Sequence, residues 1–329
     1  MLFNSPIFLF AFLPLSLFTY LLIPKKTRNL FLALASIIFY WWGEPNFIKF
    51  ILLMITVNFF FAQLISSYSR VEHKAKFFLF VGVFINLIFL SYFKYYDFFF
   101  QNIFFLFPQL KFELSTSILP LAISFFIFHA ISYLVDVYRK KIAPETNFLQ
   151  LNLYFLLFPH LLAGPIVRFS EISKQITNRV STLDNLSYGV IRFIIGLAKK
   201  VLIADTLAPV VDEIFATPPD GLMPTSALLG IFAYTLQIYF DFSGYSDMAI
   251  GLALIFGFKF PENFNYPYIA RSLQDFWRRW HMTLSNWFRD YLYIPLGGNR
   301  CSSSRNYLNI LFVFLLVRLW HGAGWNFII

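Results

Sequence analysis

The stretch Phe47–Ile65, FIKFILLMITVNFFFAQLI, indicates the class of fold, because it is apolar over the length that a helix needs to cross a lipid bilayer. The composition extends this indication to the whole chain. Of its 329 residues, 58% are hydrophobic and 13% are charged, and the mean hydropathy is +0.64. Soluble domains average about 45–50% apolar and about 25% charged residues. These values exclude a soluble enzyme, a disordered tail and a disulfide-rich secreted domain.

The loops between the apolar runs predict how the chain crosses the membrane. Further apolar runs lie at 7–23, 29–42, 77–93 and 118–135. Lys and Arg residues number three in each of the loops 24–28, 66–76 and 136–147, none in loop 43–46, and two (Lys94 and Lys111) in loop 94–117. The positive-inside rule therefore places the amino terminus outside and the three basic loops in the cytoplasm. The net charge of +9 is explained by this topology rather than by nucleic-acid binding.

The second half of the chain has a different pattern. Its apolar segments, at 151–167, 189–204 and 226–256, are interrupted by proline, glycine and charged residues. Such stretches are tolerated at membrane depth inside protein or along a wet cavity. We expect an all-α, polytopic transmembrane bundle with broken or re-entrant helices. It forms a single membrane-embedded domain over 1–329, with scaffold spans in 1–150 and the working core in 151–329.

The segment 275–291 has the pattern of an amphipathic helix. On a helical wheel one arc collects Phe276, Trp280, Leu284, Trp287 and Tyr291, and the opposite side collects Arg278, Ser285 and Arg289. Residues 271–305 contain six arginines and two aspartates, which predicts a cytoplasmic location. A final apolar run, 307–329, stops at Ile329 without a polar tail, so we expect a chain truncated at its carboxyl end.

His321 is a candidate general base, because it is an ionisable residue within an apolar run. Gly322 and Gly324 leave space beside it, and Trp325, four residues on, is expected to wall the same face. A histidine among aromatic residues is more often structural than catalytic. That reading holds for His73 in its basic loop.

Other polar residues leave their roles open. His129 and His160 are ambiguous on sequence alone. Asp241 and Asp247 interrupt an apolar run, and they are read either as a helix break or cap satisfied by Ser243 and Ser246, or as groups for proton chemistry. The pattern favours a helix break or cap at least as much as proton chemistry.

The sequence predicts no metal site and identifies no cofactor-binding residues. Cys301 is the one cysteine, so an intramolecular disulfide and a multi-cysteine zinc site are excluded. Neither a phosphate-binding glycine loop nor a spaced cluster of metal ligands is present.

Several longer motifs resemble those of bacterial membrane-bound O-acyltransferases, and their order and wording are most similar to the alginate O-acetyltransferase branch. The motifs are Gln237–Gly251, Phe260–Phe264, Phe276–His281, Tyr291–Arg300 and Leu319–Gly322, with shorter matches at Phe93–Tyr96, Ser132–Arg139 and Ala163–Arg168. The resemblance implies transfer of an acyl group to a hydroxyl in a tunnel through a helical bundle. It implies that His321 of Trp-His-Gly is catalytic and that His281 of Arg-Arg-Trp-His is a second functional histidine. Members of the family continue well beyond the Trp-His-Gly motif.

Together these observations predict a multi-pass O-acetyltransferase of the bacterial inner membrane with an extracytoplasmic amino terminus. The acetyl donor, acetyl-CoA or a similar thioester, enters from the cytoplasm near 271–305, and no cofactor is tightly bound. His321, expected in the interior of the bundle, activates the acceptor hydroxyl, and His281 positions the donor or assists proton transfer. The expected partners are the lipid bilayer and periplasmic acetyl-relay or polysaccharide-modifying proteins, with no nucleic acid.

Three alternatives remain open from the sequence. Within the enzyme class, the alternative is D-alanyl transfer to teichoic acid. Outside it, the chain is either a channel that exports an anionic polymer or a non-catalytic scaffold for exopolysaccharide enzymes.

Overall fold

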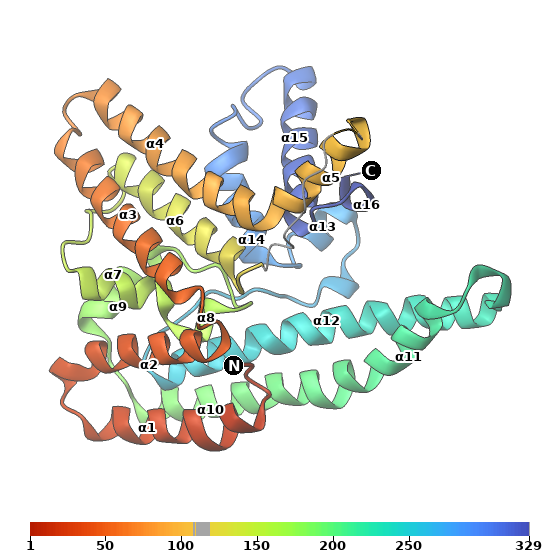
Figure 1. Cartoon of the computed structure of the whole chain (residues 1–329). Coiled ribbons are helices and arrows are strands. Elements are labelled where there is room, and N and C mark those ends of the chain that lie inside the picture. Colours follow the sequence, from red (N-terminus) through yellow and green to blue (C-terminus); the bar gives the residue numbers. More distant parts are fainter. Residues whose placement is uncertain (108, 110–118, 329) are drawn as a thin grey trace. The chain divides into compact units, whose positions relative to one another are not determined.

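The computed structural model describes residues 1–107, 109 and 119–328, and contains no β-strand within those ranges. Its α-helices are α1 (Leu13–Leu22), α2 (Arg28–Gly43), α3 (Ile48–Ser67), α4 (Glu72–Leu90), α5 (Tyr96–Leu106), α6 (Ile123–Tyr138), α7 (Phe148–Leu156), α8 (Phe158–Leu161), α9 (Phe169–Asn178), α10 (Leu183–Ala198), α11 (Asp205–Ala216), α12 (Pro224–Ile255), α13 (Leu273–Trp277), α14 (Met282–Phe288), α15 (Ser303–His321) and α16 (Trp325–Ile328). Figure 1 shows their order. The all-α prediction is confirmed for the described residues.

The helices form two compact units that alternate along the chain. The first unit contains residues 1–42, 156–167 and 171–283, and the second contains 43–155, 168–170 and 284–329. Their boundaries do not coincide with residue 150, and the single-domain organisation stays a prediction.

The predicted apolar runs are helical. Two helices, Ile48–Ser67 and Glu72–Leu106, are long and apolar enough to cross a membrane, and Phe8–Leu22 and Ile123–Tyr138 are shorter apolar helices. The helix Glu72–Leu106 consists of α4, the π-helical turn η3 (Ser91–Tyr95) and α5. Lys111 and the rest of 110–118, within the predicted loop 94–117 and at the start of the run 118–135, lie outside the described residues.

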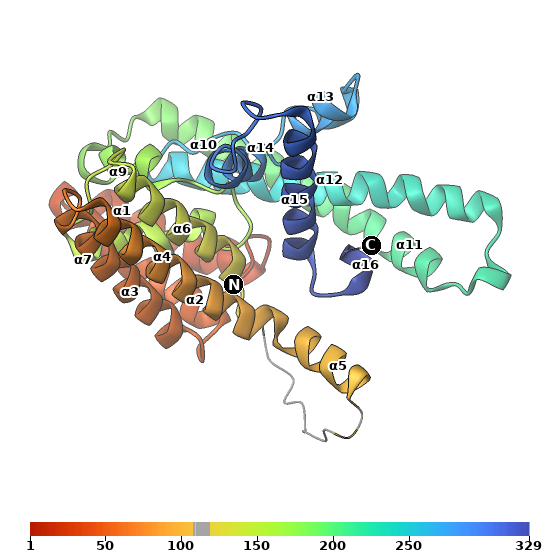
Figure 2. The same cartoon turned by 90° about the horizontal axis from the view of Figure 1, so that it is seen from above.

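In the second unit, α3, α4 and α6 lie side by side (Figure 2). A buried amide pair joins α3 to α4: Asn58 and Asn86 exchange Nδ2–H···Oδ1 bonds of 3.1 and 2.9 Å. Each amide also donates to the carbonyl four residues earlier in its own helix. The two amides are thereby hydrogen-bonded within apolar stretches of α3 and α4.

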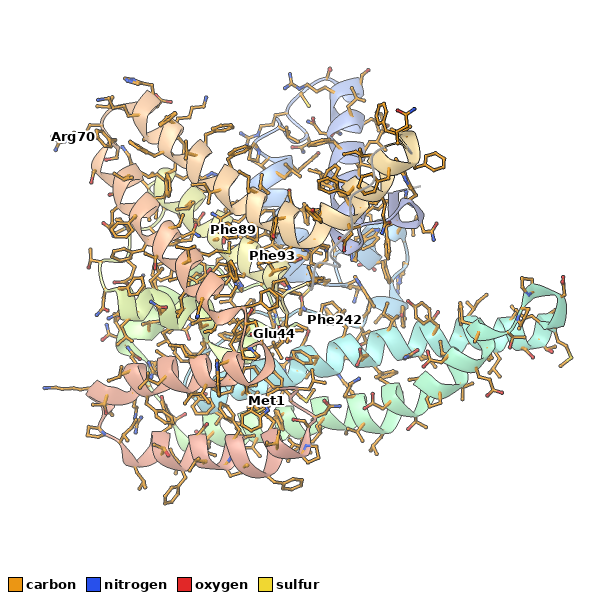
Figure 3. All side chains as sticks on the ribbon, viewed as in Figure 1. Met1, Glu44, Arg70, Phe89, Phe93 and Phe242 are labelled. Atoms are coloured by element: carbon orange, nitrogen blue, oxygen red, sulfur yellow. The ribbon has the colours of Figure 1, made fainter. Side chains whose placement is uncertain are left out.

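The ends of this three-helix group agree with the charge pattern of the loops. Glu44 and Arg70 lie at opposite ends of α3 (Figure 3). Gln63, near the same end of α3 as Arg70, donates a 2.8 Å hydrogen bond to the carbonyl of Glu145. The basic loops 66–76 and 136–147 therefore lie at one end of the group, and the assignment of that end to the cytoplasm stays a prediction.

In the first unit, aromatic rings pack between α2, α8, the π-helical turn Phe8–Phe12 before α1, and the residue that follows α12. Phe158, fully buried, lies between Phe12, Phe39 and Phe256, with ring centroids 5.4–5.6 Å away. Its backbone N–H donates to Ser36 Oγ at 3.2 Å. The helical path is interrupted just before Phe158, between α7 and α8, because Leu157 has a non-helical ψ of 108°. The predicted interruption of 151–167 is therefore confirmed.

The helices α10 and α12 approach each other closely enough to require glycine on both (Figure 1). A Cβ on Gly189 would lie 2.8 Å from the carbonyl oxygen of Gly251, and a Cβ on Gly196 would lie 2.5 Å from that of Gly244. Conversely, a Cβ on Gly251 would lie 2.6 Å from the carbonyl oxygen of Gly189, and a Cβ on Gly244 would lie 2.7 Å from that of Gly196. The two pairs are one heptad apart on each helix, so they fix a single antiparallel register.

Candidate active site

The Arg-Arg-Trp-His segment is not the continuous helix predicted for 275–291. The helices α13 and α14 are separate, because His281 has a φ of +43° in the left-handed region, which a continuing helix cannot contain. Two backbone hydrogen bonds hold the break, from Met282 N–H to the Asn263 carbonyl and from Asn265 N–H to the Arg279 carbonyl, each 2.9 Å. The predicted amphipathic helix is therefore wrong in its continuity.

The break places the His281 imidazole in a buried polar network. His281 is 3% exposed, and its Nδ1 lies 2.9 Å from Oδ1 of Asn263, which is fully buried. The same Oδ1 accepts hydrogen bonds from Thr283 Oγ1 at 2.8 Å and from Thr283 N–H at 3.4 Å. The ring of Phe242 packs edge-on against the imidazole, with 4.7 Å between centroids. His281 is thus fixed in orientation from several sides.

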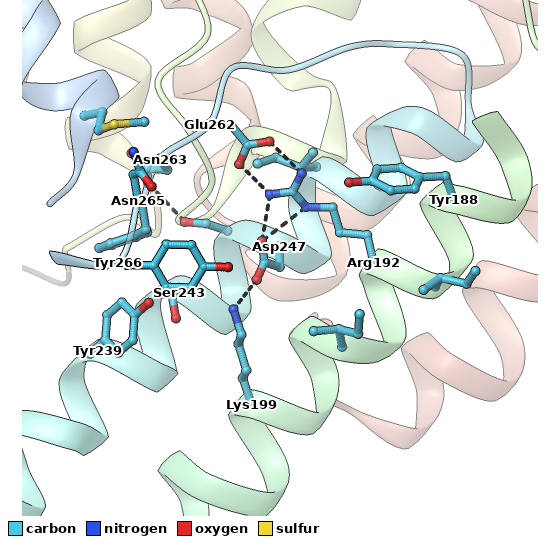
Figure 4. Close-up of a pocket in the computed structure, with 16 residues that line it drawn as sticks. Tyr188, Arg192, Lys199, Tyr239, Ser243, Asp247, Glu262, Asn263, Asn265 and Tyr266 are labelled. Atoms are coloured by element: carbon cyan, nitrogen blue, oxygen red, sulfur yellow. Dashed lines mark hydrogen bonds and ion pairs between the residues drawn. The ribbon is translucent and has the colours of Figure 1, made fainter. Parts of the chain in front are cut away.

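A pocket of about 520 Å³ borders this network at Asn263 (Figure 4). Asn263 lines it, and its Nδ2 donates to Ser246 Oγ at 3.0 Å. Charged and phenolic side chains supply much of the remaining lining, including Arg192, Lys199, Asp247, Glu262 and Tyr239. Its volume falls in the range of small-molecule sites, about 300–1,000 Å³, and its lining is more polar than is usual for them.

The pocket charges form a linked ion cluster. Arg192 lies 2.9 Å from Asp247 and 2.6 Å from Glu262, and Lys199 lies 2.6 Å from the other oxygen of Asp247. These pairs face each other because the glycine contacts set the register of α10 against α12.

The ion pairs correct the interpretation of the two aspartates. α12 is helical without interruption through Asp241 and Asp247, so neither residue breaks or caps a helix. Lys200, in the π-helical segment η4 (Lys199–Ala204), lies 2.7 Å from Asp241. Lysine and arginine, rather than Ser243 and Ser246, neutralise these carboxylates. Proton chemistry at either aspartate stays a hypothesis.

His321 is the last residue of α15. Its side chain is exposed in the described part of the chain, which contradicts the expected position inside the bundle, and its Nδ1 lies 2.8 Å from the carbonyl oxygen of Val317. The helix ends here because Gly322 is extended, and a Cβ on Gly322 would lie 2.2 Å from the ring of Phe327. Trp325 begins α16 and donates to Asn102 at 2.7 Å, so it does not follow His321 on one helix face as predicted.

Two side chains from η3 hold the end of α15. The hydroxyl of Tyr95 donates to the Leu319 carbonyl at 2.8 Å, and the ammonium of Lys94 donates to the Trp320 carbonyl. These carbonyls belong to the last turn of a helix, where no intrahelical donor is available. The Phe93–Tyr96 motif therefore supports the backbone that carries His321.

His281 belongs to the first unit and His321 to the second. The remaining histidines are spread over both: His73 is exposed, His129 is buried beside Tyr154, and His160 is buried and stacks on Phe260 with 5.4 Å between centroids. The surroundings of His129 and His160 are those of packed interior residues.

A basic cluster joins two segments that the sequence independently assigns to the cytoplasm. Arg139 donates to the Asp290 carbonyl at 3.0 Å, and the Asp290 carboxylate lies 2.7 Å from both Arg168 and Arg289. Burial raises the pKa of Asp290, but hydrogen bonds from Arg289 and Arg168 outweigh it, so the pKa lies below its usual range. The cluster presents cationic groups on a described surface of the second unit.

Asn263 and Arg192 are two residues of the candidate site that the sequence analysis did not identify. Asn263 lies in the Phe260–Phe264 motif, but nothing in that motif links it to a histidine eighteen positions later. The sequence did contain a pattern that could have predicted the close approach of α10 and α12: glycines spaced seven residues apart on each helix, at 189 and 196 and at 244 and 251. That approach is what aligns Arg192 with Asp247. No group of three metal-capable side chains occurs in the residues the structure describes.

Comparison with known proteins identifies the family. A sequence profile of the MBOAT, membrane-bound O-acyltransferase family matches residues 37–329. The probable alginate O-acetylase of Azotobacter vinelandii is 46% identical over the whole chain, which covers 66% of that relative. The peptidoglycan O-acetyltransferase of Helicobacter pylori is 41% identical, again over the whole chain and 68% of the relative. The teichoic acid D-alanyltransferase of Bacillus subtilis is 31% identical over 64% of this chain and 55% of its own length.

The chain therefore belongs to the membrane-bound O-acyltransferase family. It is similar over its full length to alginate O-acetylases, as the motifs predicted. The chain spans about two thirds of the length of the curated relatives it matches.

Proposed function

We propose that the protein is a membrane O-acetyltransferase that moves an acetyl group from a cytoplasmic thioester towards hydroxyls of an extracytoplasmic polysaccharide, with His321 as general base. The observation that carries the proposal is the hydrogen bond from His321 to Val317. A carbonyl oxygen only accepts, so Nδ1 carries the proton and the neutral imidazole has its lone pair on Nε2. An exposed Nε2 with a lone pair is the form of histidine that removes a proton from a hydroxyl.

The proposed reaction is a direct acyl transfer. Nε2 of His321 accepts the proton of the acceptor hydroxyl as its oxygen attacks the thioester carbonyl carbon. The new C–O bond forms, the C–S bond breaks, and the departing thiolate takes the proton from the imidazolium. Lys94 and Tyr95 contribute by holding the last turn of α15, which fixes where Nε2 is presented.

The proposed topology places the donor on the cytoplasmic side of a bacterial inner membrane. The basic loops and the Arg139–Arg168–Arg289 cluster then face the cytoplasm, where they attract an anionic donor such as acetyl-CoA. The amino terminus is extracytoplasmic, and periplasmic relay or polysaccharide-modifying proteins complete the transfer. The names of the two acetylating relatives support acetyl as the group transferred. D-alanyl transfer has the support of a relative that matches a smaller share of this chain.

The test measures ester-linked acetyl groups per sugar on surface polysaccharide. A null strain is complemented with the wild-type gene or with His321→Ala, and membrane levels are compared by immunoblot. We expect wild type to restore acetylation and His321→Ala to reduce it by at least about a hundredfold, because the transition state loses its base. His73→Ala, at an exposed loop position, is the matched control and should restore acetylation fully.

The alternatives predict different results. Polymer that is reduced in amount but normally acetylated indicates export or a scaffold. Acetylation by His321→Ala at near wild-type levels rejects His321 as the base. Loss of ester-linked D-alanine with acetyl unchanged selects the alanyl alternative.

A further inference from the structure

The side-chain amide of Asn263 has one orientation that fits its neighbours. The backbone N–H of Thr283 only donates, so the Asn263 atom that faces it must be the oxygen, Oδ1. The opposite atom, Nδ2, then donates to Ser246 Oγ at 3.0 Å. The Thr283 hydroxyl also accepts from Ile166 N–H at 3.1 Å, so its own proton points to Asn263 Oδ1. The acceptor facing His281 is thereby an oxygen.

From this geometry we propose that Asn263 is a positioning residue that holds His281 in the tautomer with the proton on Nδ1 and the lone pair on Nε2. Oδ1 of Asn263 cannot donate, so the nitrogen of His281 that lies 2.9 Å from it must carry hydrogen. A neutral imidazole has one protonated nitrogen, which leaves Nε2 as an acceptor. This role rests on the proposed acetyl transfer, in which His281 then serves as a hydrogen-bond or proton acceptor through Nε2.

The main chain of Asn263 reinforces this role. His281 has a left-handed φ of +43°, which a non-glycine residue keeps only when its surroundings determine it. The Asn263 carbonyl accepts from Met282 N–H at 2.9 Å, directly after the strained residue. One residue therefore fixes both the backbone at His281 and the proton on its ring.

The use of an amide rather than a carboxylate has a chemical consequence. A carboxylate beside Nδ1 would stabilise the imidazolium, whereas a neutral amide selects the tautomer without adding negative charge. The imidazole is also enclosed by the rings of Phe242 and Phe264, at 4.7 and 6.5 Å between centroids. These surroundings favour a neutral imidazole that presents Nε2 as an acceptor.

The first test is ¹⁵N magnetic resonance of the histidine-labelled protein in lipid nanodiscs. The chain has five histidines, and the pair of ring-nitrogen signals that disappears in His281→Gln is assigned to His281. Wild type should show a protonated Nδ1 and an unprotonated Nε2 at His281. The opposite tautomer in wild type overturns the inference, and this result does not depend on the folding of any Asn263 variant.

Variants then test whether Asn263 is the cause. Asn263→Asp keeps an acceptor and should keep the proton on Nδ1, whereas Asn263→Leu, of similar size, should move it to Nε2. Thr283→Val removes a hydroxyl from the same oxygen without touching His281, so it controls for general disturbance and should leave the tautomer unchanged. An unchanged tautomer in Asn263→Leu, or an equal shift in Thr283→Val, rejects the positioning role.

Steady-state acetyl transfer separates this inference from the proposed function. Asn263→Leu should lower kcat about tenfold or more with KM nearly unchanged. Asn263→Asp keeps the proton on Nδ1 but also stabilises the imidazolium, so it should recover most of the loss only at a pH high enough to deprotonate Nε2. A wild type with the expected tautomer but no transfer rejects the proposed function and leaves the role of Asn263 intact. A wild type that transfers acetyl with the proton on Nε2 rejects only the present inference.

Discussion

At the scale of single residues, a few polar contacts decide the chemistry available to the candidate site. His281 and His321 each have Nδ1 against an oxygen that only accepts, one from an amide and one from a main-chain carbonyl. Both rings therefore present Nε2 as the basic nitrogen. Asp290 shows the converse case, in which two guanidinium groups hold a carboxylate in its charged form.

The Asp290 contacts predict how stability depends on pH. Its folded pKa lies below the unfolded value of about 3.9, so the stabilisation is present above that value and is lost as the pH falls through the folded pKa. Asp290→Asn should destabilise by about 1 kcal/mol at pH 7, after allowance for screening, and by less below pH ~4. The measurement is thermal unfolding in detergent across this range. Asp220→Asn, at an exposed position, is the control, and a difference independent of pH would contradict the prediction.

At the scale of elements, helix formation followed from local composition, but helix pairing did not. The runs 7–23, 29–42, 47–65 and 77–93 are helical because a lipid environment or a protein interior both favour apolar helices. The interruption of the helix predicted over 275–291 did not follow from local composition, because the residue that holds the break, Asn263, lies outside that segment. The ion cluster of Arg192 and Asp247 was missed for the same reason. The geometry of this cluster depends on the register between α10 and α12, and the amphipathic pattern of either helix alone does not specify that register.

The glycine contacts predict a large and local sensitivity to added methyl groups. Gly196→Ala and Gly251→Ala should each destabilise by about 1–3 kcal/mol, because the new Cβ meets main-chain atoms of the facing helix that have no rotamer to change. Gly221→Ala is the matched control, since its Cβ would meet only Thr217 at 3.8 Å. Thermal unfolding of the purified variants tests this. Equal stability of all three would mean that α10 and α12 lie farther apart than described.

At the scale of the whole molecule, the chain is an all-helical member of the membrane-bound O-acyltransferase family with two interleaved units. The family, the helical class and the motif positions followed from the sequence. The division into units did not, because it depends on contacts between segments more than a hundred residues apart. Exposure of His321 was not expected either, since hydropathy reports the character of a segment rather than what surrounds one side chain.

The proposed topology predicts the labelling of engineered cysteines. In a Cys301→Ser background, Asn46→Cys should react with a membrane-impermeant maleimide in intact spheroplasts. Arg70→Cys, at the opposite end of α3, should react only after the membrane is permeabilised, because the positive-inside rule places its loop in the cytoplasm. Both positions are exposed, so accessibility within the protein is matched. Reversed labelling would invert the proposed orientation.

The interleaving of the two units constrains the order of biogenesis. Within the first unit, residues 1–42 are synthesised before the segments with which they pack, and these extend to residue 283. The hydroxyl of Tyr20 donates to the carbonyl of Phe256, so its acceptor reaches the bilayer much later. At roughly 5–20 residues per second this delay amounts to about ten to fifty seconds. During that interval the first two helices lack part of the packing that their own unit provides, so a membrane insertase that shelters early helices should increase the yield of folded protein.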